Sequence, residues 1–172
     1  MAQVHDPNYN PYAAPTSQDY AEPGRGAGGY VGYAGFWRRF VAYFIDNFIL
    51  QIVGIMVMMI AGFVINATRN NNPNLEGGIA VFALFVNFVI AVAYFAGMES
   101  SDSQATLGKM AMGIKVTDLY GRRISFGRAT GRFFGKILSS IILGIGFLMA
   151  AFTEKKQALH DMMSDTLVLK TR

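Results

Sequence analysis

The sequence predicts an all-α integral membrane protein with two full transmembrane helices, a third apolar segment and a small cytoplasmic β-hairpin. Hydrophobic residues make up 52% of the 172 residues, only 15% are charged, and the mean hydropathy is positive. This composition is typical of membrane proteins. Two apolar runs are each long enough to supply the roughly 20 helical residues that cross a bilayer. Basic residues flank these runs instead of forming a separate patch.

Residues 1–34 precede the first apolar run and predict a disordered cytoplasmic tail. The segment is rich in Pro, Gly, Tyr, Ala and Asn, and it holds too few apolar side chains to offset the entropy lost on ordering. No basic region is followed by an apolar stretch, so the segment does not resemble a cleavable signal peptide. A flexible linker and a peptide ligand for a partner domain are both open interpretations.

The first predicted span covers about residues 36–65 and carries one acid, Asp46, well inside it. A carboxylate at the centre of a membrane helix costs about 2.5–3.5 kcal/mol, so Asp46 requires a partner, a watery cavity or a proton. Arg39 is the nearest candidate partner. Seven positions, about two helical turns, separate Arg39 from Asp46 and place them on one face. Ala42 lies between them and is small enough to admit another helix.

The second predicted span covers about residues 79–98, with Asn87 and Tyr94 as its polar residues. The connection between the spans is rich in asparagine and forms turns, so it cannot lie in lipid. Basic residues precede the first span and follow the second. The positive-inside rule therefore places the N-terminus in the cytoplasm and the asparagine-rich connection outside.

The connection after the second span predicts a β-hairpin. Residues 112–117 are apolar or β-branched, residues 118–121 favour a turn, and residues 123–126 alternate polar with apolar. An irregular loop is the alternative. A final strand over residues 166–169 could add to the first strand of the hairpin, and Lys109 and Lys115 are expected to face head groups or water.

The third apolar segment covers about residues 133–152 and has two interpretations. Basic residues on both sides place both of its ends in the cytoplasm, and Gly144 and Gly146 permit a bend. A bent, re-entrant pair of half-helices is thus favoured over a straight third span. Broken helices persist in a membrane only where protein or water satisfies their free backbone groups, so the re-entrant form implies a cavity.

The composition also excludes several functions. Cysteine is absent, and the two histidines have no metal-ligand spacing, so the sequence predicts no metal site, no cofactor and no enzyme. The net charge is +4, but no basic run with interleaved aromatic residues occurs, and nucleic acid is therefore not an expected partner.

Three motifs together resemble the RDD family of small membrane proteins, which is named after one arginine and two aspartates. They lie, in order, at residues 39–46, at residues 107–116 and at residues 159–168. The resemblance covers residues 35–170 and implies that Arg39, Asp46 and Asp161 are the arginine and the two aspartates. Asp165 departs from the pattern, since related sequences usually have glycine there. The family resemblance implies transport of an unidentified ligand.

Two functions follow from these residues. The first is transport of a cation or proton through an Arg/Asp site, in which Arg39, Asp46 and Asp161 meet in one polar cluster on the cytoplasmic side. The second is a non-catalytic scaffold or accessory subunit in which the same cluster is structural. Secondary candidates for the site are Asn87, His160 and Asp165.

The predicted location is the cell (inner) membrane, which the chain crosses more than once with its N-terminus in the cytoplasm. The lipid bilayer is the first expected partner. Two spans are too few to enclose a path, so transport would require a homo-oligomer. Its contacts are expected at the small residues Gly54, Ala61 and Gly62.

Overall fold

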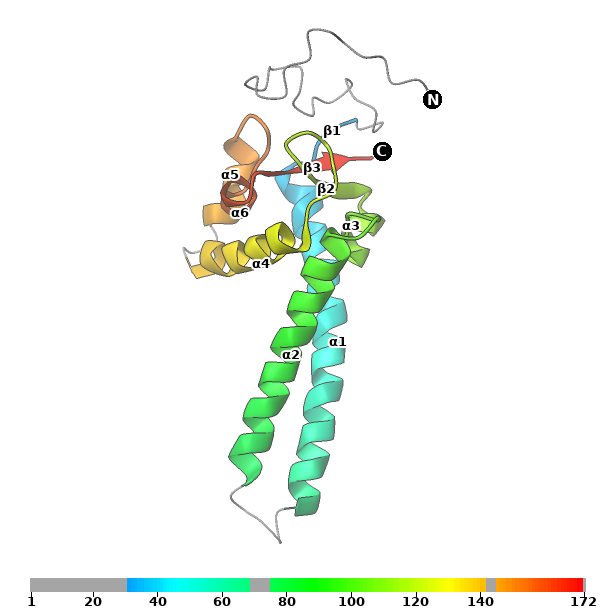
Figure 1. Cartoon of the computed structure of the whole chain (residues 1–172), viewed down its shortest axis with the longest axis vertical. Coiled ribbons are helices and arrows are strands. Elements are labelled where there is room, and N and C mark those ends of the chain that lie inside the picture. Colours follow the sequence, from blue (N-terminus) through cyan, green and yellow to red (C-terminus); the bar gives the residue numbers. More distant parts are fainter. Residues whose placement is uncertain (1–30, 69–74, 142–144, 172) are drawn as a thin grey trace, which may run out of the picture.

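The protein folds into two long antiparallel helices that carry a smaller folded region at one end (Figure 1). The structure is a computed structural model that describes residues 31–68, 75–141 and 145–171. The helices are α1 (Phe36–Thr68), α2 (Leu75–Glu99), α3 (Leu107–Ala111), α4 (Phe126–Ile141), α5 (Ile145–Phe152) and α6 (Leu159–Met163). The strands are β1 (Gly32–Tyr33), β2 (Ile114–Asp118) and β3 (Thr166–Lys170).

Helices α1 and α2 contain 33 and 25 residues, which correspond to lengths of about 50 and 38 Å. Among the described residues, only these two helices are long and apolar enough to cross a membrane. The spans predicted at residues 36–65 and 79–98 are thereby confirmed as helices of the required kind. Because a hydrocarbon core is about 30 Å thick, α1 exceeds it by about 20 Å, and its first turns extend into the folded end.

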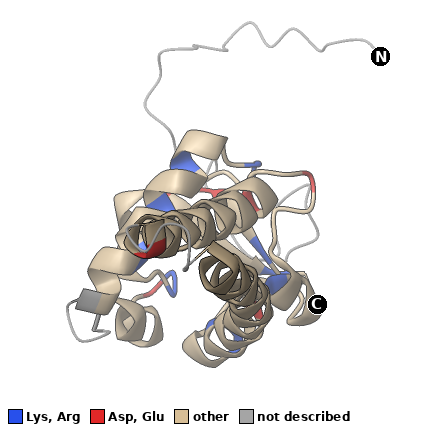
Figure 2. Cartoon of the chain, turned by 90° about the horizontal axis from the view of Figure 1, so that it is seen from below, with Lys and Arg blue, Asp and Glu red and all other residues tan. Residues whose placement is uncertain are grey.

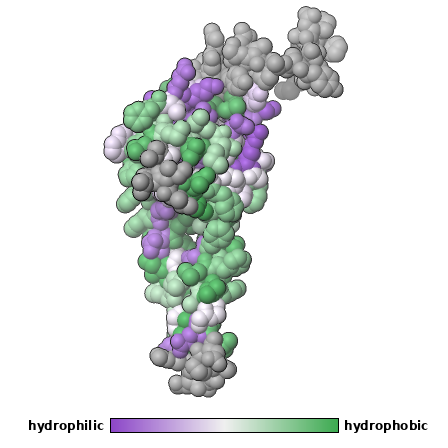
Figure 3. Space-filling view, turned by 90° about the vertical axis from the view of Figure 1, so that its left-hand side faces the viewer, coloured by the Kyte–Doolittle hydropathy of each residue, from purple (hydrophilic) through white to green (hydrophobic). Residues whose placement is uncertain are grey.

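We refer to the sheet, α3–α6 and the adjoining ends of α1 and α2 as the head. Seen along the long helices, basic and acidic residues are interleaved across the head (Figure 2). Apolar surface covers much of the long helices, whereas hydrophilic surface is concentrated on the head (Figure 3). The large apolar side chains along α1 and α2 are mostly exposed, as expected for helices that face lipid.

The head contains a three-stranded antiparallel sheet in the order β1-β3-β2. The predicted pairing of the last strand with residues 114–116 is confirmed, with Val116 opposite Val168. Strand β1 lies within the predicted tail. Val31 N donates to Lys170 O (3.0 Å) and Ala34 N to Val168 O (2.8 Å), so residues 31–34 belong to the fold. The rest of the predicted tail, residues 1–30, and most of the asparagine-rich connection lie outside the described residues.

The predicted β-hairpin over residues 112–126 is wrong, and the fold is therefore mostly helical with a sheet made from distant segments. The chain does turn at 118–122, where the Asp118 carboxylate accepts hydrogen bonds from Tyr120 N (2.9 Å) and Arg122 N (2.8 Å). The returning segment does not pair further, because the free edge of β2 is already occupied. Val116 N donates to Gln104 O (2.8 Å), and the Gln104 side chain donates to Val116 O (3.2 Å).

The third apolar segment is divided between two helices. Helix α4 ends at Ile141 and α5 begins at Ile145, so the segment is not one straight helix. The break agrees with the bent form expected from the sequence, although Gly144 itself lies outside the described residues. Helix α4 packs against α2 and extends sideways from its head end (Figure 1). Entry of α4 and α5 into the bilayer stays a prediction.

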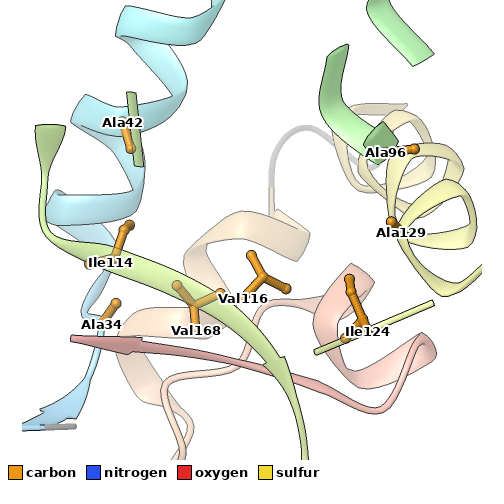
Figure 4. Close-up of a cluster of buried hydrophobic side chains, with 8 residues drawn as sticks. All are labelled: Ala34, Ala42, Ala96, Ile114, Val116, Ile124, Ala129 and Val168. Atoms are coloured by element: carbon orange, nitrogen blue, oxygen red, sulfur yellow. The ribbon is translucent and has the colours of Figure 1, made fainter. Parts of the chain in front are cut away.

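The core of the head consists of small and β-branched side chains (Figure 4). Alanines contributed by α1, α2 and α4 let these helices lie close to the sheet, whose β-branched residues fill the centre. The members are Ala34, Ala42, Ala96, Ile114, Val116, Ile124, Ala129 and Val168. This apolar cluster positions α1, α2 and α4, and these three helices carry most of the charged residues described next.

Candidate functional site

The first polar group of the site is Asp46, which is fully buried inside the head end of α1. Its carboxyl group accepts hydrogen bonds from Thr106 Oγ1 (2.5 Å), Tyr94 Oη (2.7 Å) and Gly108 N (2.7 Å). A carboxylate is an acceptor-only group, so three donors compensate for its removal from water. Asp46 therefore joins α1 to α2 and to the start of α3.

Gly108 makes the approach of α3 to α1 possible. A Cβ atom at this position would lie 2.1 Å from Ala42 O and 2.9 Å from the Asp46 carboxyl carbon. The sequence predicts that the small residue Ala42 admits another helix, and the structure identifies that helix as α3. Only glycine fits at position 108, because any Cβ atom would overlap the Ala42 carbonyl oxygen. The contact between α1 and α3 therefore depends on Gly108 and Ala42.

The second polar group is centred on Asp161 at the start of α6, which is also fully buried. Arg39 Nη1 donates to one of its carboxylate oxygens and Arg132 Nη2 to the other. Ala158 N donates to the same group (3.1 Å). Arg39 is held further by a hydrogen bond from its Nε to Ala34 O (2.8 Å).

Glu99, the last residue of α2, forms a third acidic centre. Its carboxylate accepts from Lys109 Nζ, from Lys136 Nζ (2.9 Å) and from Arg132 Nη1 (3.1 Å). Arg132 thus bridges Glu99 and Asp161. We call the connected set the charge network, and its members come from five helices: Arg39, Glu99, Lys109, Arg132, Lys136 and Asp161.

The sequence predicts one cluster of Arg39, Asp46 and Asp161, and the structure corrects this. Arg39 and Asp161 are in contact, but within the described part of the chain Asp46 forms no ion pair and keeps its own set of neutral donors. Its depth explains the difference, because Asp46 is about 10 Å further along α1 than Arg39. At that level α3 reaches it and α6 does not.

Burial and charge shift the titration of the groups outside the long helices. Burial alone would raise the pKa of Asp161, but Arg39 and Arg132 outweigh it and hold the pKa well below its usual range. Burial lowers the pKa of His160 to about 3, despite the neighbouring Asp161 carboxylate. Burial also lowers the pKa of Lys109 to about 7, against the attraction of Glu99.

A cavity of about 350 Å³ lies against the charge network. Its walls include all four basic residues of the network, together with Asp46 and several aromatic rings. Three buried nitrogen atoms on its walls have no hydrogen-bond partner among the described residues, namely Arg39 Nη2, Arg132 Nε and His160 Nδ1. The cavity therefore combines positive charge, spare donors and apolar surface.

The secondary candidates lie in different places. His160 lines the cavity, with its Nε2 3.5 Å from Asp161 Oδ1 and its ring 5.1 Å from the Phe147 ring. Asn87 lies in a neighbouring groove of about 700 Å³ that is lined by α1, α2 and α4 and shares Lys136 with the cavity. Its side-chain amide donates to Ala83 O (2.9 Å). Asp165 is exposed and has a φ of 48°. This left-handed conformation favours glycine, which is the residue that the family resemblance leads one to expect at this position.

Four members of the charge network were not recognised as site residues: Glu99, Lys109, Arg132 and Lys136. The expectation that Lys109 faces head groups or water is wrong, since only 8% of its surface is exposed. The sequence contains a pattern that could have identified two of these four residues. Arg132 and Lys136 recur with Ala129 and Ser139 at intervals of three or four residues, so they fall on the buried face of α4.

The chain is similar to proteins of one family. A model of the RDD family matches residues 33–165. An uncharacterized protein of Bacillus subtilis (strain 168), YxaI, is 40% identical over 146 residues, which cover 79% of this chain and 96% of that protein. The uncharacterized membrane protein YteJ of the same organism is 33% identical over 144 residues, 80% of each chain. No solved structure matches the chain.

Proposed function

The chain belongs to the RDD family and is a membrane protein, and from this premise we propose that it binds a small charged ligand in the head cavity as the recognition step of transport. The observation that carries the proposal is the cavity itself. Four basic side chains converge on its walls, and two of them present buried nitrogens that have no partner in the part of the chain that the structure describes. Buried donors that lack partners are costly, so a ligand would lower the free energy of the site.

The proposal refines the ligand expected from the sequence. Four basic side chains of the network stand against three carboxyl groups, those of Glu99, Asp161 and Asp46, and Asp46 is the one of these three that lines the cavity. This balance favours a negatively charged ligand over the cation or proton first expected. The proposed role is non-catalytic: the protein recognises the ligand and lets it pass without changing it chemically.

Transport requires more than one copy of the chain, because two helices cannot enclose a path. Gly54 is unsuited to contacts between copies, since a Cβ there would lie 2.9 Å from Asn87 Oδ1 of the same chain. Gly62 has open space around it and is the better candidate for close packing of α1 against a second copy. We propose a homo-oligomer in the cell membrane with the head in the cytoplasm.

The test is solute flux into proteoliposomes across a panel of small anions and cations and across a pH gradient. Lys136→Gln is the informative variant, because Glu99 keeps Lys109 and Arg132 as partners when Lys136 is lost. Arg128→Gln is the matched control, since it removes an exposed basic residue from the same helix. We expect flux of at least one solute that Lys136→Gln reduces and Arg128→Gln does not.

A second candidate function is a membrane scaffold or accessory subunit in which the charge network locks the helices together. It is favoured by the spread of the network over five helices and by the multiple partners of Glu99 and Asp161. No flux of any solute by a wild-type protein that is folded and assembled would favour the scaffold.

A further inference from the structure

The charge network leaves the cavity short of negative charge. Asp161 is shared by two guanidinium groups, and Glu99 is shared by two ammonium groups and one of the same guanidinium groups. Of the three carboxyl groups, Asp46 is the one that lines the cavity, and its three hydrogen bonds come from a tyrosine, a threonine and a backbone amide. Four basic side chains line the same cavity. An anion bound in the cavity would bring the numbers of positive and negative groups closer together.

The donors that have no partner are of the kind that binds oxyanions. The Arg132 side chain is about 1% exposed. Its Nε and the Nη2 of Arg39 are buried, and neither has a hydrogen-bond partner within residues 31–68, 75–141 and 145–171. Both residues line the cavity. Guanidinium groups bind carboxylate and phosphate oxygens through paired, charge-assisted hydrogen bonds.

The cavity reaches the outer surface of the head between apolar side chains. Phe36, Phe40 and Leu148 line the cavity together with the charged residues. Phe40 and Leu148 are 49% and 46% exposed, so they belong at once to the cavity and to the outer surface. Such residues would accommodate a hydrocarbon chain while the basic residues hold a charged group.

We propose that the head cavity binds an oxyanion, a phosphate or carboxylate group, and that the apolar walls make the head group of an acidic lipid its source. The oxyanion accepts hydrogen bonds from Arg39 and Arg132 and lies near Lys136, and the acyl chain leaves past Phe40 and Leu148. This inference names the class of ligand for the site proposed above and rests on that proposal.

Trp37 provides the probe for a test. It is the one tryptophan of the chain, and its ring lies 5.4 Å from the Phe36 ring and 6.1 Å from the Phe40 ring. A brominated acyl chain that leaves the cavity would therefore quench Trp37. The full-length protein is reconstituted in phosphatidylcholine vesicles and titrated with brominated phosphatidic acid or brominated phosphatidylcholine, in about 1 M NaCl to screen surface attraction.

The expected result is an association of phosphatidic acid about tenfold stronger than that of phosphatidylcholine, as charge-assisted hydrogen bonds would give. Lys136→Gln should reduce this preference and Arg128→Gln should retain it. Arg39→Lys, which keeps the charge but removes the spare donor, should also reduce it. Equal association of the two lipids with the wild-type protein would overturn the proposal, whatever the variants do.

Inorganic phosphate separates the two sources of the oxyanion. If millimolar phosphate leaves the lipid preference intact, the lipid head group is the source, and if phosphate displaces the lipid, the oxyanion is taken free from solution. The lipid-association experiment and the flux experiment can also fail independently of each other. Equal lipid association with flux that depends on Lys136 would overturn the oxyanion alone, whereas a lipid preference without flux would overturn only the transport step.

Discussion

At the scale of single residues, Asp161 is the group whose loss should harm the protein most. It is fully buried between the guanidinium groups of Arg39 and Arg132. Removing one partner of a buried ion pair leaves uncompensated charge and costs about 3–5 kcal/mol. We therefore expect Asp161→Asn to lower the free energy of unfolding in detergent by about this amount.

Asp165→Asn is the control for this prediction. Asp165 is exposed, and Asn also tolerates its left-handed backbone, so its free energy of unfolding should change by less than about 0.5 kcal/mol. Similar losses of unfolding free energy in Asp161→Asn and Asp165→Asn would show that the Asp161 carboxylate is not needed to compensate the two buried guanidinium groups.

His160 should make the protein sensitive to mild acid. Its pKa is about 3 in the folded chain because of burial, against about 6.5 in an unfolded chain. Between these values the unfolded state binds more protons, so stability falls as the pH falls from about 6.5 toward 3. The groups that face His160 are Asp161, Arg132, Lys136 and Arg39, and the lowered pKa of Asp161 adds a further loss below about pH 4.

The measurement is the unfolding midpoint in detergent as a function of pH. His160→Gln should flatten the slope between about pH 6.5 and 4, and His5→Gln, the other histidine of the chain, should retain it. An unchanged slope in His160→Gln would assign the acid sensitivity to other groups.

At the scale of elements, the contact between α3 and α1 should depend on Gly108. A methyl group at this position would overlap Ala42 O, so α3 must move and the hydrogen bond from Gly108 N to Asp46 is strained or lost. We expect Gly108→Ala to destabilise the protein by at least about 2 kcal/mol in thermal or denaturant unfolding.

Gly127→Ala provides the comparison, because a Cβ at Gly127 meets nothing within 4 Å. Alanine has the higher helix propensity, so this change should be neutral or stabilising by up to about 1 kcal/mol. A Gly108→Ala protein as stable as the Gly127→Ala protein would contradict the close approach.

Local patterns in the sequence predicted the elements that depend on local physics. The two long helices followed from their apolar runs, and the strand at 166–169 followed from its β-branched and apolar residues. The hairpin failed because strand pairing was decided by distant residues: β3 and Gln104 occupy the two edges of β2. Likewise, Glu99 and Lys109 resemble ordinary interfacial charges, and only the packing of α4 onto α2 makes them a buried pair.

At the scale of the whole molecule, the proposed orientation places the head in the cytoplasm. The basic residues of the head and the positive-inside rule support this. The chain has no cysteine, so a single Lys170→Cys substitution at the end of β3 reports the location of the head. We expect labelling by a membrane-impermeant maleimide only after the cells are opened, and labelling in intact cells would reverse the orientation.

The central claim is that the six charged residues form one network, in which Arg132 links Glu99 to Asp161. A double-mutant cycle of Glu99→Gln and Asp161→Asn tests it most directly, with unfolding free energies measured for both single variants and the double variant. Residues that share a partner should be coupled by about 0.5–3 kcal/mol. The pair Asp161→Asn and Asp102→Asn should be additive, since the Asp102 carboxylate is exposed and binds only Arg123 among the described residues. Additivity of Glu99→Gln and Asp161→Asn within about 0.5 kcal/mol would contradict a single network.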